Sequence, residues 1–427
     1  NVAIGQNTFD ANSTGANNTA VGSASLGANT TGASNVAVGA LALDESTTGT
    51  ENTAIGVNTL GHVTTGSYNT AVGKDAGRDH TTAASLVAIG HSALRKNTTG
   101  ASNTAVGVDS LISNTTGATN SAFGLNALNS NTTASNNVAI GCGALCANTT
   151  GEVNTAVGTA SMVTNTTGFG NTALGKNSLY TNNGNNNTAV GHEALELNTS
   201  GANNVAVGRQ ALEANTTGAH NTAVGCGAMA STTTSGENVA VGFGALATQT
   251  TGAPNNAFGN QALCKLTTGT NNVGMGFRAM CDLTTGTHNV MVGNLTGQGI
   301  TTGSENTGVG YNTMNSAVTG QGNAAFGYSN MAALTSGATN LSLGNSSSPA
   351  LTTGSNNTTA GASSGISLTT GSNNLLLGHD AGRSGSPGGT VTTGSNEIVL
   401  GDENISKANI QVDWTVASDQ RDKTDFN

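Results

Sequence analysis

The side chains that could do chemistry in this chain are few and scattered. Histidine, the usual general base and metal ligand, occurs seven times. His91, His192 and His379 each follow the glycine of one recurring motif, but on distant stretches of the chain, and no His-x-His pair occurs. Asp and Glu total 22 and follow no regular spacing, so they nominate no pair of acids of the kind that a glycosidase needs. The sequence therefore predicts no metal site, no cofactor and no conventional active site.

The cysteines likewise point to structure rather than chemistry. There are five, at Cys142, Cys146, Cys226, Cys264 and Cys281, and an odd number does not suggest a disulfide framework. Paired C-x₂-C spacings typical of zinc sites are absent. Cys142 and Cys146 are four residues apart on an expected extended segment, which places them too far apart to bind one ion. We expect Cys264 and Cys281, seventeen residues apart, to be small buried thiols in the same position of adjacent repeats.

The elements that must position these side chains come from a repeat of seventeen residues. A short Asn-(Thr/Val)-Ala-(Val/Ile)-Gly run recurs in twenty-four copies, with one sixteen-residue step to Gly191 and a six-residue insertion before Gly401. Numbering each repeat from its Asn makes the closing glycine position 5. A fixed short period of this kind is typical of a solenoid, in which each repeat forms one turn of a rod.

Within one repeat, the β-branched run closed by glycine predicts a short strand. Position 4 is large and apolar, and position 9 is usually Leu or Met, as at Leu26. We therefore expect positions 4 and 9 to fill the narrow interior, with glycines at positions 5 and 15 taking positive φ at the corners. Position 1 is nearly always Asn, and stacking then predicts an Asn ladder along the rod.

A turn of seventeen residues encloses a small core, so one chain alone gains little from burial. Position 3 is Ala in the first sixteen copies, from Ala3 to Ala257. Because strand residues alternate between faces, we expect this Ala to form a second surface at which copies of the chain approach each other closely. The predicted fold is an all-β, parallel β-solenoid (β-roll) of 17-residue coils, assembled as a homotrimeric fibre.

Composition excludes several other classes. Charged residues are 8% and aromatic residues 3%, which is unlike an ordinary globular enzyme. The net charge is −10 with no basic stripe, so nucleic acid is not an expected partner. No apolar run approaches the length of a membrane span. The chain begins inside the motif without Met, and we expect an N-terminal part to precede it.

Three further patterns have plain structural interpretations. Asn-Thr-Thr triplets, as at Asn97 and Asn215, match the glycosylation pattern but are expected to be turns. Adjacent threonines would face opposite ways on a strand, which disfavours ice binding. In Lys74-Asp75-Ala76-Gly77-Arg78 and His379-Asp380-Ala381-Gly382-Arg383, Gly replaces the core Leu, and we expect a local turn with an Asp–Arg pair.

The Asn-Thr-Ala-Val-Gly and Asn-Val-Ala-Ile-Gly runs resemble the head repeat of YadA-type trimeric autotransporter adhesins, whose coil is shorter than seventeen residues. The longer Gly-x-x-Ala-Leu-x-x-Asn-Thr-Thr-Gly form resembles repeats of bacteriophage tail fibres, over residues 1 to about 401. The resemblance implies a trimer of left-handed parallel β-rolls.

A second resemblance lies at the C-terminus. Ala417-Ser418-Asp419-Gln420-Arg421-Asp422-Lys423 is similar to the opening of the intramolecular chaperone domain of phage tail spikes, the peptidase S74 family. That resemblance implies one self-cleavage between Ala417 and Ser418, with Ser418 as nucleophile and Lys423 as its base. A base is needed because a serine hydroxyl is a weak nucleophile.

These observations lead to one functional hypothesis and two alternatives. We expect a β-solenoid shaft over 1–383, an irregular cap over 384–417 and the start of a chaperone over 418–427. The chain would be an adhesive viral tail fibre, located in the virion, that contacts a host receptor or glycan, acts on no substrate and inserts in no membrane. The first alternative is a bacterial trimeric surface adhesin, which would need a membrane anchor. The second is an enzyme acting on polysaccharide.

Overall fold

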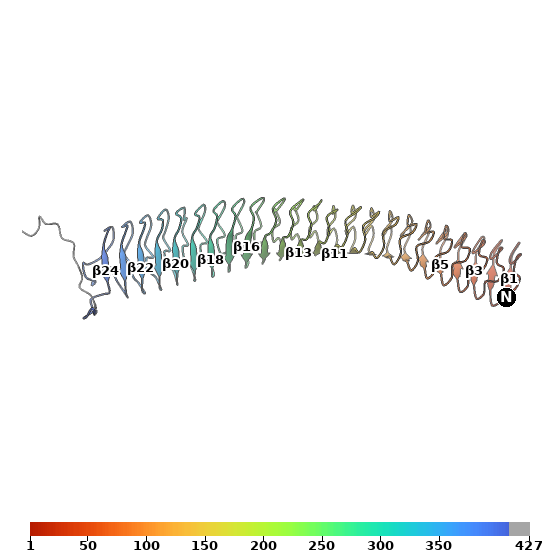
Figure 1. Cartoon of the computed structure of the whole chain (residues 1–427), viewed down its shortest axis with the longest axis horizontal. Helices are drawn as coiled ribbons and strands as arrows, with labels where there is room; N and C mark the ends of the chain where they lie inside the picture. The colour runs from red at the N-terminus through yellow and green to blue at the C-terminus, as the bar shows by residue number, and fades with distance from the viewer. Residues whose placement is uncertain (410–427) are drawn as a thin grey trace, which may run out of the picture.

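The computed structural model describes residues 1–409, which form one long, gently curved rod (Figure 1). Within these residues the chain winds into successive turns, and each turn contributes one short strand to a single parallel sheet along the rod. The prediction of an all-β parallel β-solenoid with turns of seventeen residues is confirmed. The ribbon shows the strands side by side along one side of the shaft, with the connecting loops on the other.

Twenty-four strands make up the described part of the sheet. They are β1 Val2–Ile4, β2 Thr19–Val21, β3 Val36–Val38, β4 Thr53–Ile55, β5 Thr70–Val72, β6 Val87–Ile89, β7 Thr104–Val106, β8 Ser121–Phe123, β9 Val138–Ile140, β10 Thr155–Val157, β11 Thr172–Leu174, β12 Thr188–Val190, β13 Val205–Val207, β14 Thr222–Val224, β15 Val239–Val241, β16 Asn255–Phe258, β17 Asn272–Met275, β18 Val290–Val292, β19 Thr307–Val309, β20 Ala324–Phe326, β21 Leu341–Leu343, β22 Thr358–Ala360, β23 Leu375–Leu377 and β24 Ile398–Leu400.

Every strand pairs in parallel with the next at the same position of the repeat. Ala20 lies opposite Ala37, and the amide of Gly39 donates to the carbonyl of Val21 in the preceding turn at 2.8 Å. The sixteen-residue step is absorbed without loss of register, because Ala173 still faces Ala189. The six-residue insertion is absorbed as well: β24 pairs with β23 beyond it, so regular stacking continues past a point where we expected it to end.

Glycine is needed at positions 5 and 15 of each turn for two different physical reasons. At position 5 the backbone takes a φ near +135°, as at Gly39, where a side chain would be strained. At position 15 the glycine has no left-handed φ, contrary to our expectation. Instead, a Cβ added at Gly49 would lie 2.5 Å from the carbonyl oxygen of Gly66 in the next turn. Position 15 is therefore small because adjacent turns approach so closely there.

The corners rely on ordinary residues that the sequence did not mark as unusual. Positions 7, 9 and 17 adopt left-handed φ values in most turns, for example Ala24 at 55°, Leu26 at 51° and Ser34 at 59°. Such values are uncommon outside glycine, asparagine and aspartate. Here the hydrogen bonds to neighbouring turns hold them, since Ala24 donates to Gln6 and Leu26 to Ala42.

The interior differs from our expectation in one respect. Leu and Met at position 9 are fully buried, as predicted, but their partner from the strand is the Ala at position 3, which is also fully buried. Position 4 faces outward and is half-exposed or exposed. The expected roles of positions 3 and 4 were therefore reversed. The physical reason is space: position 9 fills the narrow interior from the opposite wall, and only a small side chain fits across from it.

The later turns show this limit directly, because side-chain size is exchanged between the two walls. Met291 and Leu376 replace the Ala at position 3, and in the same turns position 9 becomes Gly297 and Gly382. A Cβ at Gly297 would lie 2.8 Å from Met291 Cγ, and one at Gly382 would lie 3.1 Å from Leu376 Cδ1. In these two turns a large side chain on one wall is thus matched by glycine on the other.

The Asn at position 1 is buried from Asn18 to Asn374 and links three turns. The Oδ1 atom of Asn35 accepts from the backbone amide of Asn52 at 2.9 Å, and its Nδ2 donates to the Gly49 carbonyl at 2.8 Å and to Asn18 Oδ1 at 3.1 Å. The predicted Asn ladder is confirmed, although much of it is bonded to backbone rather than to the next amide.

Position 12 forms a second buried column that changes character along the shaft. Between Asn97 and Asn215 it is an Asn ladder, with Asn114 Nδ2 donating to Asn97 Oδ1 at 2.6 Å. From Leu266 onward it is mostly apolar. His80 begins the ladder: its Nε2 lies 2.6 Å from the Ala83 carbonyl and its Nδ1 lies 3.0 Å from Asn97 Nδ2. Burial lowers the pKa of this histidine.

Two cysteines form a disulfide across adjacent turns. Cys264 and Cys281 occupy the same position of neighbouring repeats, as predicted, with Cα atoms 4.8 Å apart. The expectation of free thiols at this pair is wrong, because one rung of the sheet already brings the two Cα atoms within the usual range for a disulfide. Such a crosslink is typical of oxidising environments. Among the described residues, no helix is long and apolar enough to cross a membrane.

Candidate functional site

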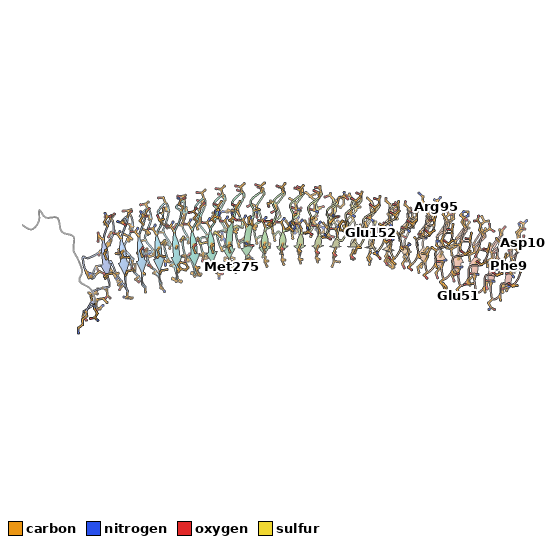
Figure 2. All side chains as sticks on the ribbon, in the orientation of Figure 1. Phe9, Asp10, Glu51, Arg95, Glu152 and Met275 are labelled. Carbon is orange, nitrogen blue, oxygen red and sulfur yellow. A yellow bond between two sulfur atoms is a disulfide. The ribbon has the colours of Figure 1, made fainter. Side chains whose placement is uncertain are left out.

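The most extensive surface feature is the outward face of the sheet. Position 4 carries an apolar side chain in every turn from Ile4 to Leu400, and many of these are exposed, with Ile55 and Ile140 each 41% exposed. We call this file the position-4 stripe. Figure 2 places one of its members, Met275, at the strand-bearing edge of the shaft. An apolar surface of this length is unusual for a monomeric protein and marks an interaction surface.

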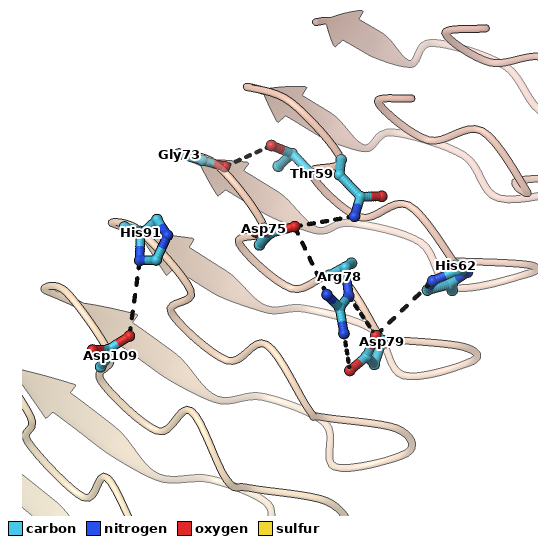
Figure 3. A network of polar contacts seen from close by, with 9 residues as sticks. Thr59, His62, Gly73, Asp75, Arg78, Asp79, His91 and Asp109 are labelled. Atoms are coloured by element: carbon cyan, nitrogen blue, oxygen red, sulfur yellow. Dashed lines mark hydrogen bonds and ion pairs between the residues drawn. The ribbon is translucent and has the colours of Figure 1, made fainter. Parts of the chain in front are cut away.

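A cluster of charged side chains lies on turns near the N-terminal end (Figure 3). The Arg78 guanidinium makes two hydrogen bonds to Asp79, at 2.7 and 3.1 Å, and approaches Asp75 at 4.0 Å. These carboxylates raise the pKa of Arg78, chiefly through the bond to Asp79. Asn58, which lies in the preceding turn, donates a hydrogen bond from Nδ2 to Asp75 Oδ1 at 3.0 Å. Arg78 thus contacts both carboxylates, and the cluster closes the variant turn that contains Gly77.

The predicted Asp–Arg pairs are therefore formed, but not identically. Arg383 binds Asp380 at 2.9 Å, as expected, whereas Arg78 has Asp79 as its main partner. In the first of these turns Gly77 lacks the core side chain that position 9 carries in most turns. Leu60 of the preceding turn fills this space, since a Cβ at Gly77 would lie 2.7 Å from Leu60 Cδ2.

The three histidines that follow the position-5 glycine are not brought together. Each instead faces a nearby carboxylate: His91 Nδ1 lies 3.9 Å from Asp109, and His192 Nδ1 lies 3.3 Å from Glu193. His379 lies 3.5 Å from Asp380 and 3.7 Å from Asp402, and the ligand atoms of these three residues lie within 4.8 Å of one another. The Asp380 oxygen in this group is already bound by Arg383.

One carboxylate cluster escaped the sequence reasoning. Glu193, Glu196 and Glu213 place their oxygens within 4.8 Å of one another. Burial, followed by the charges of Glu193 and Glu213, raises the pKa of Glu196. The signal was available, because Glu196 and Glu213 are seventeen residues apart and so lie at the same position of adjacent turns. Gln210 donates to Glu193 at 3.0 Å, which ties the cluster into the side-chain network of the shaft.

Two sequence patterns prove structural. Asn97 and Asn215, which match the glycosylation pattern, are fully buried in the position-12 ladder. Of each Thr-Thr pair, one hydroxyl is used inside the stack: Thr30 donates to the Thr47 carbonyl at 3.0 Å, whereas Thr31 faces solvent. The structure thus presents a single outward file of threonines, although these residues lie in bends and not in the strands that the alternation argument assumed.

A flank of the shaft carries shallow hollows beside that threonine file. One is lined by Thr150, Glu152, Val153, Thr167 and Phe169. Another is lined by Ala219, His220, Thr234, Gly236, Glu237, Ala253 and Pro254. Their walls come from positions 14, 16 and 17, where the left-handed residue at position 17 turns the chain back toward the strand.

The residues proposed for self-cleavage, Ser418 and Lys423, lie outside the described part of the chain. No known protein-family model matches this sequence, and no curated protein is significantly similar to it. The fold and the repeat therefore define the class: this is a repeat protein that forms a parallel β-solenoid with seventeen residues per turn.

Proposed function

We propose that the chain is the shaft of a homotrimeric viral tail fibre that adheres to a host surface. The position-4 stripe is the observation that supports this proposal. It is apolar in every turn and outward-facing, and a second and third copy would remove it from water. The earlier argument from Ala at position 3 does not support a trimer, because that Ala is inside the solenoid. The disulfide is compatible with an extracellular location.

Three copies, rather than two, follow from the resemblance to trimeric adhesins and tail fibres. In this arrangement each copy turns its position-4 stripe toward a common axis, and the surfaces that face away from this axis remain available to the host. A bacterial trimeric surface adhesin is the second candidate, favoured by the same stripe. No catalytic activity is proposed apart from one self-cleavage before Ser418, with Lys423 as the base.

The mass of the native assembly and of its denatured chain tests this proposal. The native fibre should contain three copies, and a mass equal to one copy contradicts the trimer. If self-cleavage occurs, the denatured chain of the expressed gene should end at Ala417, and Lys423→Ala should leave it longer. Pull-down of host cells by the native fibre tests adhesion, and a fibre that adheres to no cell contradicts the adhesive function.

A further inference from the structure

Aromatic side chains gather on one stretch of the shaft. The turns beginning at Asn238 through Asn340 carry four of the eight Phe and two of the four Tyr residues of the chain. All six occupy positions 4 and 6, and all six are exposed. We call the position-6 residues of these turns the aromatic file, and they are Phe243, Asn260, Phe277, Asn294, Tyr311, Tyr328 and Asn345.

The aromatic file differs from the rest of the same column. In the fourteen earlier turns position 6 is never aromatic, and it includes Lys74, Lys176 and Arg209. In the seven turns of the file, the outward positions 2, 4 and 6 carry no charged residue at all. The position-4 stripe, by contrast, is apolar along the whole shaft. A contact between parallel copies repeats along its length, so the stripe suits that role, whereas a local change of chemistry suits a ligand.

The file is held rigidly by hydrogen bonds between turns. The carbonyl of each of its residues from Phe243 to Tyr328 accepts from the position-7 amide of the next turn, as in Leu295 to Phe277 at 2.9 Å and Ser329 to Tyr311 at 2.9 Å. Asn294 Oδ1 also accepts from the Phe277 amide at 3.2 Å, which fixes that side chain. The rings of Tyr311 and Tyr328 are stacked, with centroids 5.5 Å apart and planes within 11°. A platform held in this way loses little entropy when a ligand binds.

From this geometry we infer that the aromatic file binds a neutral, extended polysaccharide, an inference that rests on the proposed adhesive function and names its receptor. Aromatic faces pack against the C–H faces of pyranose rings, and the amides between them can bond to hydroxyls. Phe243, Phe277 and Tyr311 alternate with Asn at a spacing of two rungs, roughly 10 Å, which is close to the length of two sugar units in an extended chain. The aromatic file itself carries no charged side chain, so it offers no ion pair to an acidic glycan.

The test is binding of the full-length native fibre to immobilised neutral and acidic bacterial surface oligosaccharides. The double variant Phe277→Ala/Tyr311→Ala removes two rings of the file. The matched control, Val108→Ala/Leu125→Ala, removes two exposed side chains at position 6 of turns outside it. We expect at least one neutral glycan to bind, the double variant to weaken that binding by about tenfold or more, and the control to leave it unchanged.

Three outcomes would overturn the inference: no neutral glycan binds, acidic glycans bind best, or the control weakens binding as much as the double variant. Native mass is measured on both variants. If the double variant alone dissociates the fibre, the file is a contact between copies and the inference is wrong. If the double variant loses no glycan binding but the fibre still adheres to host cells, the inference fails while the adhesive function stands. A fibre that binds no cell at all contradicts the proposed function itself.

Discussion

At the scale of single residues, the buried amides hold the turns in register. Asn204 at position 1 accepts from the Asn221 amide at 3.0 Å and donates to the Gly218 carbonyl at 2.9 Å and to Asn187 at 3.2 Å. Because these groups are shut off from water, one side chain satisfies backbone atoms in two turns. The same arrangement recurs along the column, which explains why Asn is retained at position 1.

Replacing Asn204 with Ala should leave the Asn221 amide buried without a partner, whereas the Gly218 carbonyl keeps its hydrogen bond from Asn215. We expect a loss of about 1–3 kcal/mol in the free energy of unfolding, which is the cost of one unsatisfied buried group. Urea denaturation followed by circular dichroism measures it. Thr217→Ala, at an exposed position of the same turn, should change little. Equal effects of the two variants would contradict this role for the amide.

His80 should make stability depend on pH. Burial lowers its pKa in the folded protein below the ordinary value of about 6.5, so the unfolded chain binds more protons as the pH falls. The contribution of neutral His80 to the free energy of unfolding is therefore complete above pH ~6.5. It is lost as the pH falls toward the pKa of His80 in the folded protein. The contacts are consistent with a neutral ring, because Nε2 faces a carbonyl and Nδ1 faces the Asn97 amide.

The variant His80→Asn introduces the residue that the following turn has at this position, Asn97, and cannot titrate. We expect the melting temperature of the native protein to fall between pH 7.5 and 5.5 by more than that of the variant. His62→Asn, which removes an exposed histidine, provides the comparison. A variant with the same pH profile as the native protein would show that His80 is not the responsible group.

At the scale of the turn, the core is a pair of side chains from opposite walls. Leu or Met at position 9 faces Ala at position 3 in most turns, and the order of sizes is inverted where Met291 faces Gly297. The backbone at Gly297 does not itself require glycine, because its φ of 64° is close to the φ of 51° at Leu26. The restriction at Gly297 comes from the volume of Met291.

Gly297→Leu should therefore overpack one turn and cost about 1–3 kcal/mol. Adding Met291→Ala recreates the pair used by most turns and should recover most of that loss. The double-mutant cycle, measured by thermal unfolding, gives a coupling between the two sites. Additive effects would contradict the proposed exchange of size, and Met291→Ala alone should destabilise the turn by leaving a cavity.

At the scale of the whole molecule, the solenoid is nearly one-dimensional, since each turn contacts only its neighbours. Its curvature (Figure 1) and its length come from stacking, not from a central core. The position-4 stripe stays apolar over the described length, and this constant apolar character is why we assign it to contacts between copies. The aromatic file is local and is assigned to a ligand.

A triple variant should separate the role of the position-4 stripe from that of the aromatic file. It is Ile55→Thr/Ile89→Thr/Ile140→Thr. The three side chains face outward and are 39–41% exposed, so we expect the secondary structure of a single chain to persist, since Thr remains a good strand residue. The native mass should shift toward that of one copy at low concentration. A control triple variant at outward threonines, Thr31→Ala/Thr65→Ala/Thr99→Ala, should keep the mass of the assembly. A stripe variant with unchanged mass would contradict the assignment.

The sequence alone determined the period, the strands, the register and the Asn ladder. These follow from a repeat, because parallel stacking brings residues seventeen apart together whatever the details of each turn. The tertiary structure decided which strand face is inside. Alternation says that positions 3 and 4 lie on opposite faces but not which is buried, and the narrow interior already filled by position 9 leaves room only for Ala. It also decided that the Cys264–Cys281 pair is bonded and that Glu193 joins Glu196 and Glu213, because both depend on side-chain approach between turns.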